Sequence, residues 1–208
     1  MKKLKEFILT ENNFFKNLGI GKVRIEEWLN KYKIKNYTIN DDLTIDVKGD
    51  VDLKYYPENE FPDYIQFRNV SGTFSLYTSK ISSLKGCPIK VDGGFDCERC
   101  KNLTSLKGAP NECKSFDCSN CRNLTSLEGA PNECEYFDCS DCDKLTSLKG
   151  SPKKVLGNFV CNYCNSLKSL KGLPDVIEGN LKCKGCNLKS DDIYPYYKNV
   201  YCDIIYFY

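Results

Sequence analysis

Ten of the fourteen cysteines in this 208-residue chain stand in Cys-x-x-Cys pairs. The pairs are Cys97 and Cys100, Cys118 and Cys121, Cys139 and Cys142, Cys161 and Cys164, and Cys183 and Cys186. Thiols at this spacing bind zinc, exchange disulfides or fill a protein core. Successive pairs are separated by 17 or 18 residues, a spacing that fits four-cysteine zinc sites. Zinc is therefore an alternative cofactor for these ten residues.

Three features favour a core of free thiols instead. Five pairs are an odd number for sites that need two pairs each. Cys113 and Cys134 stand at a repeat position that other copies fill with Val91, Val155 and Ile177, so cysteine serves there as a small hydrophobe. A redox role needs one exposed pair at the start of a helix, which five regular copies do not suit. We therefore expect a buried thiol ladder and no cofactor.

Other catalytic chemistry finds little support in the sequence. The chain contains no histidine, which excludes Ser-His and Cys-His nucleophilic arrangements. The glycine pairs Gly19-Ile-Gly21 and Gly93-Gly94 lack the context of a phosphate-binding loop. We expect the protein not to be an enzyme.

A repeat of 21–22 residues positions the cysteine pairs. Each copy places an apolar residue two before the first cysteine and a leucine two or three after the second, and the first four copies continue with a second leucine, a glycine and a proline. The apolar residues are Phe95, Phe116, Phe137, Phe159 and Leu181, and the leucines begin with Leu103 and Leu106 in the first of these copies. More divergent copies begin at Val51 and Phe74, which gives about seven. The Phe-x-Cys triplet predicts a short strand, and such units bury their apolar sides only when stacked.

The repeat F-x-C-x-x-C-x-x-L-T-S-L-x-G-x-P resembles the leucine-rich repeat, with cysteine at its (N/C) position. Its L-T-S-L-x-G-x-P end resembles the short repeat of bacterial effectors, and the whole arrangement resembles repeat proteins of tailed phages and giant viruses. The resemblance implies an α+β, mostly β solenoid of short parallel strands that binds a protein partner on its concave face. The ligase domain that some such effectors carry is not expected here.

The outward strand positions define a candidate partner-binding face. Read along the stack, the central residues are Asp52, Ser75, Asp96, Asp117, Asp138, Val160 and Lys182. The candidate binding residues are Asp96, Glu98, Arg99, Asp117, Asp138, Asp141 and Tyr163. The acidic centre predicts a protein partner with a basic patch and argues against nucleic acid. A solvated face whose aspartates only prevent edge pairing is the alternative.

The two ends differ from the repeats. We expect a helical N-terminal cap at residues 1–36, strands at 37–50, repeats at 51–190 and an aromatic C-terminal cap at 191–208. Within the first cap, Ile25, Trp28, Leu29 and Tyr32 recur at helical spacing, and Trp28 is expected to anchor the core. Ile193 to Tyr208 contains six tyrosines, which suit a cover for the last repeat or an oligomer contact.

The composition suggests a protein of a reducing cytoplasm. The apolar run Phe7–Leu9 is too short for a secretory signal or a membrane span, and a net charge of +2 gives no general attraction to membranes or nucleic acid. We expect a host-cytoplasm or virion location if the protein is virus-encoded. A structural component that oligomerises through its ends and a zinc-stabilised repeat domain are the alternative functions. The oligomeric state stays undetermined.

Overall fold

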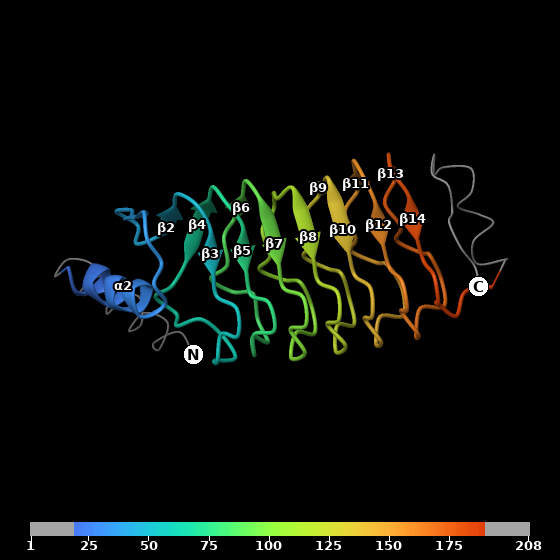
Figure 1. Cartoon of the computed structure of the whole chain (residues 1–208), viewed down its shortest axis with the longest axis horizontal. Helices are drawn as coiled ribbons and strands as arrows, with labels where there is room; N and C mark the ends of the chain where they lie inside the picture. Colours follow the sequence, from blue (N-terminus) through green and yellow to red (C-terminus); the bar gives the residue numbers. More distant parts are fainter. Residues whose placement is uncertain (1–18, 190–208) are drawn as a thin grey trace, which may run out of the picture.

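The computed structural model describes residues 19–189. In this range the chain forms a mostly β solenoid with one helix near its N-terminal end, as the repeat predicted (Figure 1). The apolar pattern at Leu4–Leu18 and the aromatic cap at 191–208 lie outside the described residues.

The described elements are one helix and fourteen short strands. The helix is α2 (Ile20–Lys31), and the strands are β1 (Tyr37–Ile39), β2 (Ile45–Val47), β3 (Val51–Asp52), β4 (Phe67–Val70), β5 (Phe74–Ser75), β6 (Lys90–Val91), β7 (Gly94–Asp96), β8 (Ser115–Asp117), β9 (Glu133–Cys134), β10 (Tyr136–Asp138), β11 (Lys154–Val155), β12 (Phe159–Val160), β13 (Val176–Ile177) and β14 (Leu181–Lys182).

Seven strands form one parallel sheet along the stack. Its order is β14-β12-β10-β8-β7-β5-β3, and neighbouring strands come from successive coils. This sheet contains one strand from each of the seven predicted repeats. Its three longest strands, β7, β8 and β10, begin one residue before the phenylalanine and end at the aspartate, so the strand lies slightly earlier than the predicted Phe-x-Cys triplet.

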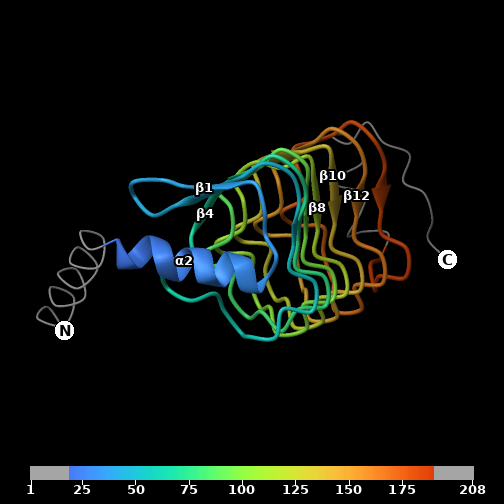
Figure 2. The ribbon, with the colours of Figure 1, turned by 60° about the vertical axis from the view of Figure 1, so that its left-hand side comes forward.

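A second ladder of strands runs along another side of the coils, and the sequence pattern did not reveal it (Figure 2). It comprises β2, β4 and β6, then β9, β11 and β13. Isolated parallel bridges at Glu112 connect the two groups. The apolar residues Val91, Cys134, Val155 and Ile177, expected only as volume fillers, therefore also belong to strands. Strands β6, β9, β11 and β13 have two residues each, too few to show the alternation that identifies a strand in a sequence.

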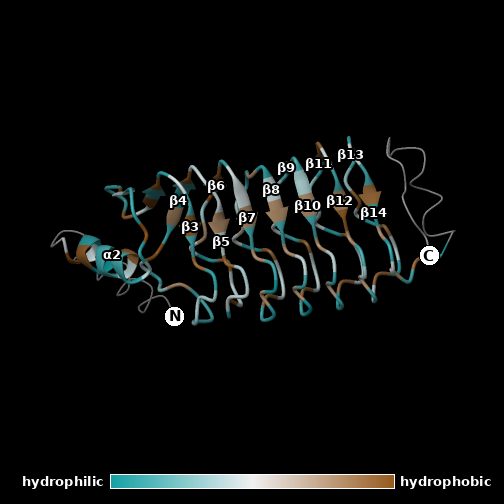
Figure 3. Cartoon of the chain, in the orientation of Figure 1, coloured by the Kyte–Doolittle hydropathy of each residue, from teal (hydrophilic) through white to brown (hydrophobic). Residues whose placement is uncertain are grey.

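Aligned columns of side chains make up the core. Phe74, Phe95, Phe116, Phe137 and Phe159 stack along the axis, with ring centroids 5.2–5.7 Å apart. All five are almost completely buried, as are the leucines that follow each cysteine pair, such as Leu124 and Leu127. Apolar segments recur from strand to strand, whereas the turns along the lower edge of the coils are mostly hydrophilic (Figure 3). Each coil thus buries its apolar side against its neighbours, which no single coil could do.

The glycine of each repeat marks the closest approach of neighbouring backbones. Gly129 has φ +103°, and a Cβ placed there would lie 2.4 Å from the carbonyl oxygen of Leu106 in the preceding coil. Gly150 and Gly172 are similarly confined, with backbone atoms at 2.5 and 2.6 Å. Any side chain would therefore force the coils apart, which explains why glycine recurs at this position.

The N-terminal end packs against the first coils through aromatic contacts. Helix α2 buries Ile25, Trp28 and Leu29, as their spacing predicted. The Trp28 ring lies 5.6 Å from Phe61 and 6.1 Å from Phe67, between ring centroids, so the predicted core anchor is confirmed. Strands β1 and β2 pair antiparallel within residues 37–50, and β2 then pairs with β4.

Candidate functional site

The strand register places the central outward residues in one row. Asp96 pairs with Asp117, and Asp117 pairs with Asp138, across β7, β8 and β10. Parallel strands lie about 4.8 Å apart, so three carboxylates occupy neighbouring positions on one face. The structure therefore brings together the three aspartates that the repeat aligned.

These aspartates also cap the turns that follow their strands. In each, Oδ1 accepts a hydrogen bond from the backbone N–H two residues later: Glu98 N at 2.9 Å, Ser119 N at 2.9 Å and Ser140 N at 2.8 Å. The Ser75 hydroxyl donates to the second oxygen of Asp96 at 2.7 Å, and the Tyr136 hydroxyl donates to that of Asp138 at 2.8 Å. The carboxylates thus have a structural role that the sequence reading did not anticipate.

The row is less exposed than expected. Asp96, Asp117 and Asp138 are half-buried, and Ser75 and Val160 are buried, although all were expected to face solvent. Ser119 and Ser140, two residues after Asp117 and Asp138, are also buried, each with 8% of its surface exposed. They lie in the tight turns that the aspartates cap, which draws their short side chains against the next coil.

Asp117 is the electrostatic centre of the row. Partial burial raises its pKa to about 6, and the charges of Asp138 and Asp96 on either side add to this effect. The hydrogen bond from Ser119 opposes the rise without cancelling it. Burial, followed by the hydrogen bond to Asp138, raises the pKa of Tyr136 as well. Burial, with a smaller contribution from the like charges on either side, therefore brings the pKa of Asp117 closer to neutral pH.

A second row lies in the turns after the strands, where the backbone adopts a left-handed conformation. It comprises Tyr55, Thr78, Arg99, Asn120, Asp141 and Tyr163, all with φ between 56° and 60°, and Gly185 at 71°. Asparagine, aspartate and glycine tolerate this conformation best, whereas tyrosine, threonine and arginine are uncommon there. Three predicted site residues, Arg99, Asp141 and Tyr163, belong to this row.

The large side chains of this second row are on the surface. Arg99 forms an ion pair with Glu98 at 3.1 Å and lies 5.7 Å from the centre of the Tyr77 ring. Tyr77 in turn meets Tyr55 edge-to-face at 6.2 Å between centroids. Tyr163 lies over Gly185, where a Cβ would come within 2.5 Å of its ring. Tyr77 and Tyr136 were not among the candidate site residues, although both stand within two residues of a row member in the repeat frame.

The cysteine columns lie inside the stack. Nine of the ten paired cysteines are buried, and Cys186 is half-buried. Each second cysteine donates its S–H to a carbonyl oxygen of the preceding coil, as from Cys121 to Cys97 at 3.2 Å and from Cys142 to Cys118 at 3.4 Å. Burial raises the pKa of Cys100 to about 12, which keeps that thiol protonated. Between residues 19 and 189, no group of three or more potential ligands is placed to hold a metal ion.

Chelation should leave the stability of the reduced protein unchanged. The thiols already use their hydrogen atoms in bonds to backbone carbonyls, so the coils can stack without a metal. We expect the same thermal midpoint with and without excess EDTA under reducing conditions, measured by circular dichroism. A midpoint that fell with EDTA and recovered on adding Zn²⁺ would instead support the zinc alternative at Cys97–Cys186.

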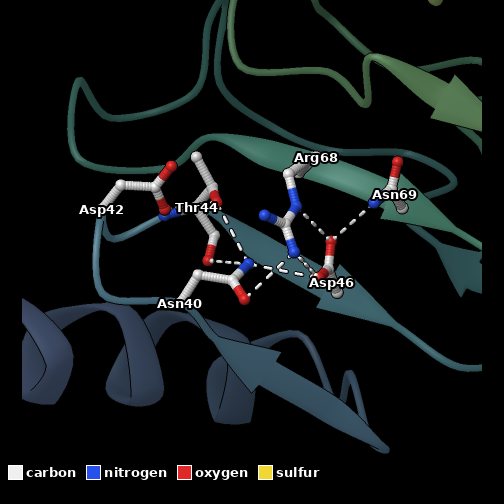
Figure 4. A network of polar contacts seen from close by, with 6 residues as sticks. All are labelled: Asn40, Asp42, Thr44, Asp46, Arg68 and Asn69. Atoms are coloured by element: carbon white, nitrogen blue, oxygen red, sulfur yellow. Dashed lines mark hydrogen bonds and ion pairs between the residues drawn. The ribbon is translucent and has the colours of Figure 1, made fainter.

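A separate polar network joins the N-terminal hairpin to the first coils (Figure 4). Arg68 on β4 forms an ion pair with Asp46 on β2 through two nitrogens, and Asn40 and Asn69 donate to the same carboxylate. The hydrogen bonds from Arg68 lower the pKa of Asp46. Each of the six residues drawn makes at least one hydrogen bond to another member of the network. We therefore assign the network to hairpin docking rather than to ligand binding.

Comparison with models of known families, with curated proteins and with solved structures finds no match to this chain. Between residues 19 and 189 there is no helix with the length and apolarity needed to cross a membrane.

Proposed function

We propose that this protein is a non-enzymatic interaction module of the leucine-rich-repeat type. It binds a basic segment of a partner protein on a docking surface made of Asp96, Glu98, Arg99, Asp117, Asp138, Asp141 and Tyr163. The observation that carries the proposal is the pairing of an in-register acidic row with large exposed side chains held at positive φ.

The conformational cost of the second row supports a binding role. A residue other than glycine in the left-handed backbone conformation costs roughly 1–2 kcal/mol of conformational energy. Asn120, Asp141 and Gly185 show that this fold accepts residues that reduce the cost. Tyr163 is nevertheless 45% exposed and Tyr55 67% exposed, so little burial offsets their conformational cost. Exposed tyrosines at these conformationally costly positions are consistent with a surface that contacts a partner.

The spacing of the aspartates favours a helical partner. Three carboxylates at intervals of about 4.8 Å extend along the solenoid axis. Basic side chains on one face of an α-helix recur every three or four residues, at about 4.5–6 Å along its axis. Residues on the same face of an extended strand are about 6.6 Å apart, so a third basic side chain would no longer lie opposite the third aspartate. We therefore propose a basic amphipathic helix lying along the row.

Several features suit such a module. A stacked solenoid is already ordered, so binding needs little further loss of conformational freedom. The thiol at the (N/C) position of the repeat bonds to the backbone, as the resemblance requires of that position. No disulfide joins the cysteines of residues 19–189, which is consistent with a reducing setting such as the cytoplasm of a host cell or, for a virus-encoded protein, the virion.

Neutralising the acidic row should weaken binding of a basic helix. In the variant D96N/D117N/D138N, each asparagine keeps the oxygen that caps the turn but loses its charge. We expect the affinity for a synthetic helical peptide with arginines at positions i, i+3 and i+7 to fall roughly tenfold or more, since each exposed pair contributes up to about 1 kcal/mol. Fluorescence anisotropy at low and high salt measures the affinity and its salt dependence.

The matched control removes three charges in and next to the second ladder. E112Q/E133Q/E135Q changes the net charge equally but leaves the docking surface intact. We expect it to bind like the wild type, and a peptide with the same residues in scrambled order should bind weakly to all three proteins. Equal loss of binding in both triple variants would show that net charge alone attracts the peptide and would refute a defined docking surface.

A further inference from the structure

The thiols of neighbouring coils are paired diagonally. Four of the five second cysteines lie against the first cysteine of the coil before them, with the sulfur 2.9–3.4 Å from that residue's carbonyl oxygen. The pairs are Cys97 with Cys121, Cys118 with Cys142, Cys139 with Cys164, and Cys161 with Cys186. In all four pairs the two thiols also interact with each other. The fold therefore holds pairs of sulfurs in contact without joining them.

The ladder of sulfurs ends differently on its two sides. Towards the N-terminus, Ser79 takes the second-cysteine position, and its hydroxyl lies 3.2 Å from the Cys100 sulfur. Towards the C-terminus, the ladder ends in Cys186, which alone among the cysteines of residues 19–189 is half-buried rather than buried. One end thus carries a hydroxyl that cannot form a disulfide, and the other carries an accessible thiol.

The surroundings of Cys186 also favour its ionisation over that of the interior thiols. Burial raises the pKa of Cys118 far above its usual value. The nearby thiols of Cys161 and Cys164, in contrast, lower the pKa of Cys186. The thiolate is the form that reacts with oxidants and alkylating agents. Three converging sulfurs, one of them accessible, thus form a site unlike any other in the described ladder.

We propose that Cys186 is a peroxide-reactive modification site and that Cys161 is its resolving thiol, so that mild oxidation links the last two described coils by a disulfide. In the first step the Cys186 sulfur attacks one oxygen of hydrogen peroxide, which yields a sulfenic acid and one water. The Cys161 sulfur then attacks the Cys186 sulfur, the S–O bond breaks, and a second water leaves. Two thiols lose two hydrogen atoms in total, and one peroxide is reduced to two waters.

Cys161 is the expected resolving residue because of the diagonal arrangement. The Cys186 sulfur lies 2.9 Å from the Cys161 carbonyl oxygen, closer than any other second cysteine lies to its partner. Cys164, the other thiol near Cys186, instead donates to the carbonyl of Cys139 at 3.2 Å. This chemistry depends on the thiol ladder alone and stands apart from the proposed docking of a partner.

Two mass-spectrometric measurements on the reduced full-length chain test the site. With limiting N-ethylmaleimide, peptide mapping should show Cys186 alkylated at least roughly tenfold faster than Cys118, because the interior thiols are buried and protonated. With equimolar hydrogen peroxide, the protein should lose two hydrogen atoms in mass, and the crosslinked peptides should contain Cys161 and Cys186. The same digest also maps Cys202, which lies outside the described residues, because this thiol competes for the same reagents.

Two serine variants make the test specific. C186S should abolish the crosslink. We expect this variant to fold, because Ser79 already occupies the same repeat position in an earlier coil. C100S, a change in the same column inside the stack, should leave the crosslink unaltered. Alkylation of Cys186 no faster than that of Cys118 would overturn the proposed site. A crosslink to Cys164 or Cys202, or one that survives in C186S, would overturn the Cys161–Cys186 pairing.

Discussion

Replacing Phe116 with alanine should lower the free energy of unfolding by about 3–5 kcal/mol, the usual cost of removing a fully buried ring. Phe116 has no exposed surface and lies between two parallel rings, 5.2 Å from Phe95 and 5.4 Å from Phe137. The cavity would interrupt the aromatic column in the middle of the stack. Each coil of a solenoid is stabilised mainly by its neighbours, so both adjoining interfaces are weakened at once. Urea unfolding followed by circular dichroism measures the loss.

Phe116→Leu provides the matched control. Leucine occupies the same position in the last described coil as Leu181, and valine occupies it in the first as Val51, so an aliphatic side chain fits this site. We expect the leucine variant to lose less than half as much stability as the alanine variant, because it refills most of the volume. If the alanine variant lost less than about 1 kcal/mol, the phenylalanine column would not be the main core of the fold.

Asp117→Asn should stabilise the protein at neutral pH and make its stability less dependent on pH. The pKa of Asp117 is raised from 3.8 to about 6 in the folded state, so the folded protein binds this proton more tightly than the unfolded chain does. Between about pH 4 and pH 6 the wild type should lose stability as the pH rises, and the full loss remains above pH 6. A rise of two pKa units corresponds to at most about 3 kcal/mol, and partial exposure to water reduces the expected effect to about 1–2 kcal/mol.

Asparagine is a suitable replacement because its side-chain oxygen still accepts the hydrogen bond from the Ser119 N–H. The test is the free energy of unfolding in urea at pH 4.5, 6 and 7.5 for both proteins. Asp52→Asn serves as the control, since Asp52 is exposed at the end of the same row and accepts the equivalent bond from Lys54 N at 3.1 Å. Parallel pH profiles for the wild type and Asp117→Asn would contradict a raised pKa at Asp117.

The sequence determined much of the architecture because the repeat is a local pattern. Aligning the copies of Phe-x-Cys placed Phe95, Phe116 and Phe137 in one buried column and Asp96, Asp117 and Asp138 in one outward row. Both follow from a fixed repeat length, since coils of equal length stack position on position. The buried thiol ladder was expected because cysteine shares another repeat position with Val91, Val155 and Ile177, and nine of the ten paired cysteines are buried.

The tertiary structure alone decided how the coils meet. The second ladder through Cys134 and Val155, the half-burial of Asp117 and the bond from each second thiol to the preceding coil all depend on contacts between residues about twenty positions apart. A repeat pattern shows which residues occupy equivalent positions, but not the distance between neighbouring copies. Because neighbouring coils pack closely, Asp117 is half-buried and caps a turn, although its repeat position suggested a solvated carboxylate. The same packing leaves Cys186, at the end of the described ladder, as its accessible thiol.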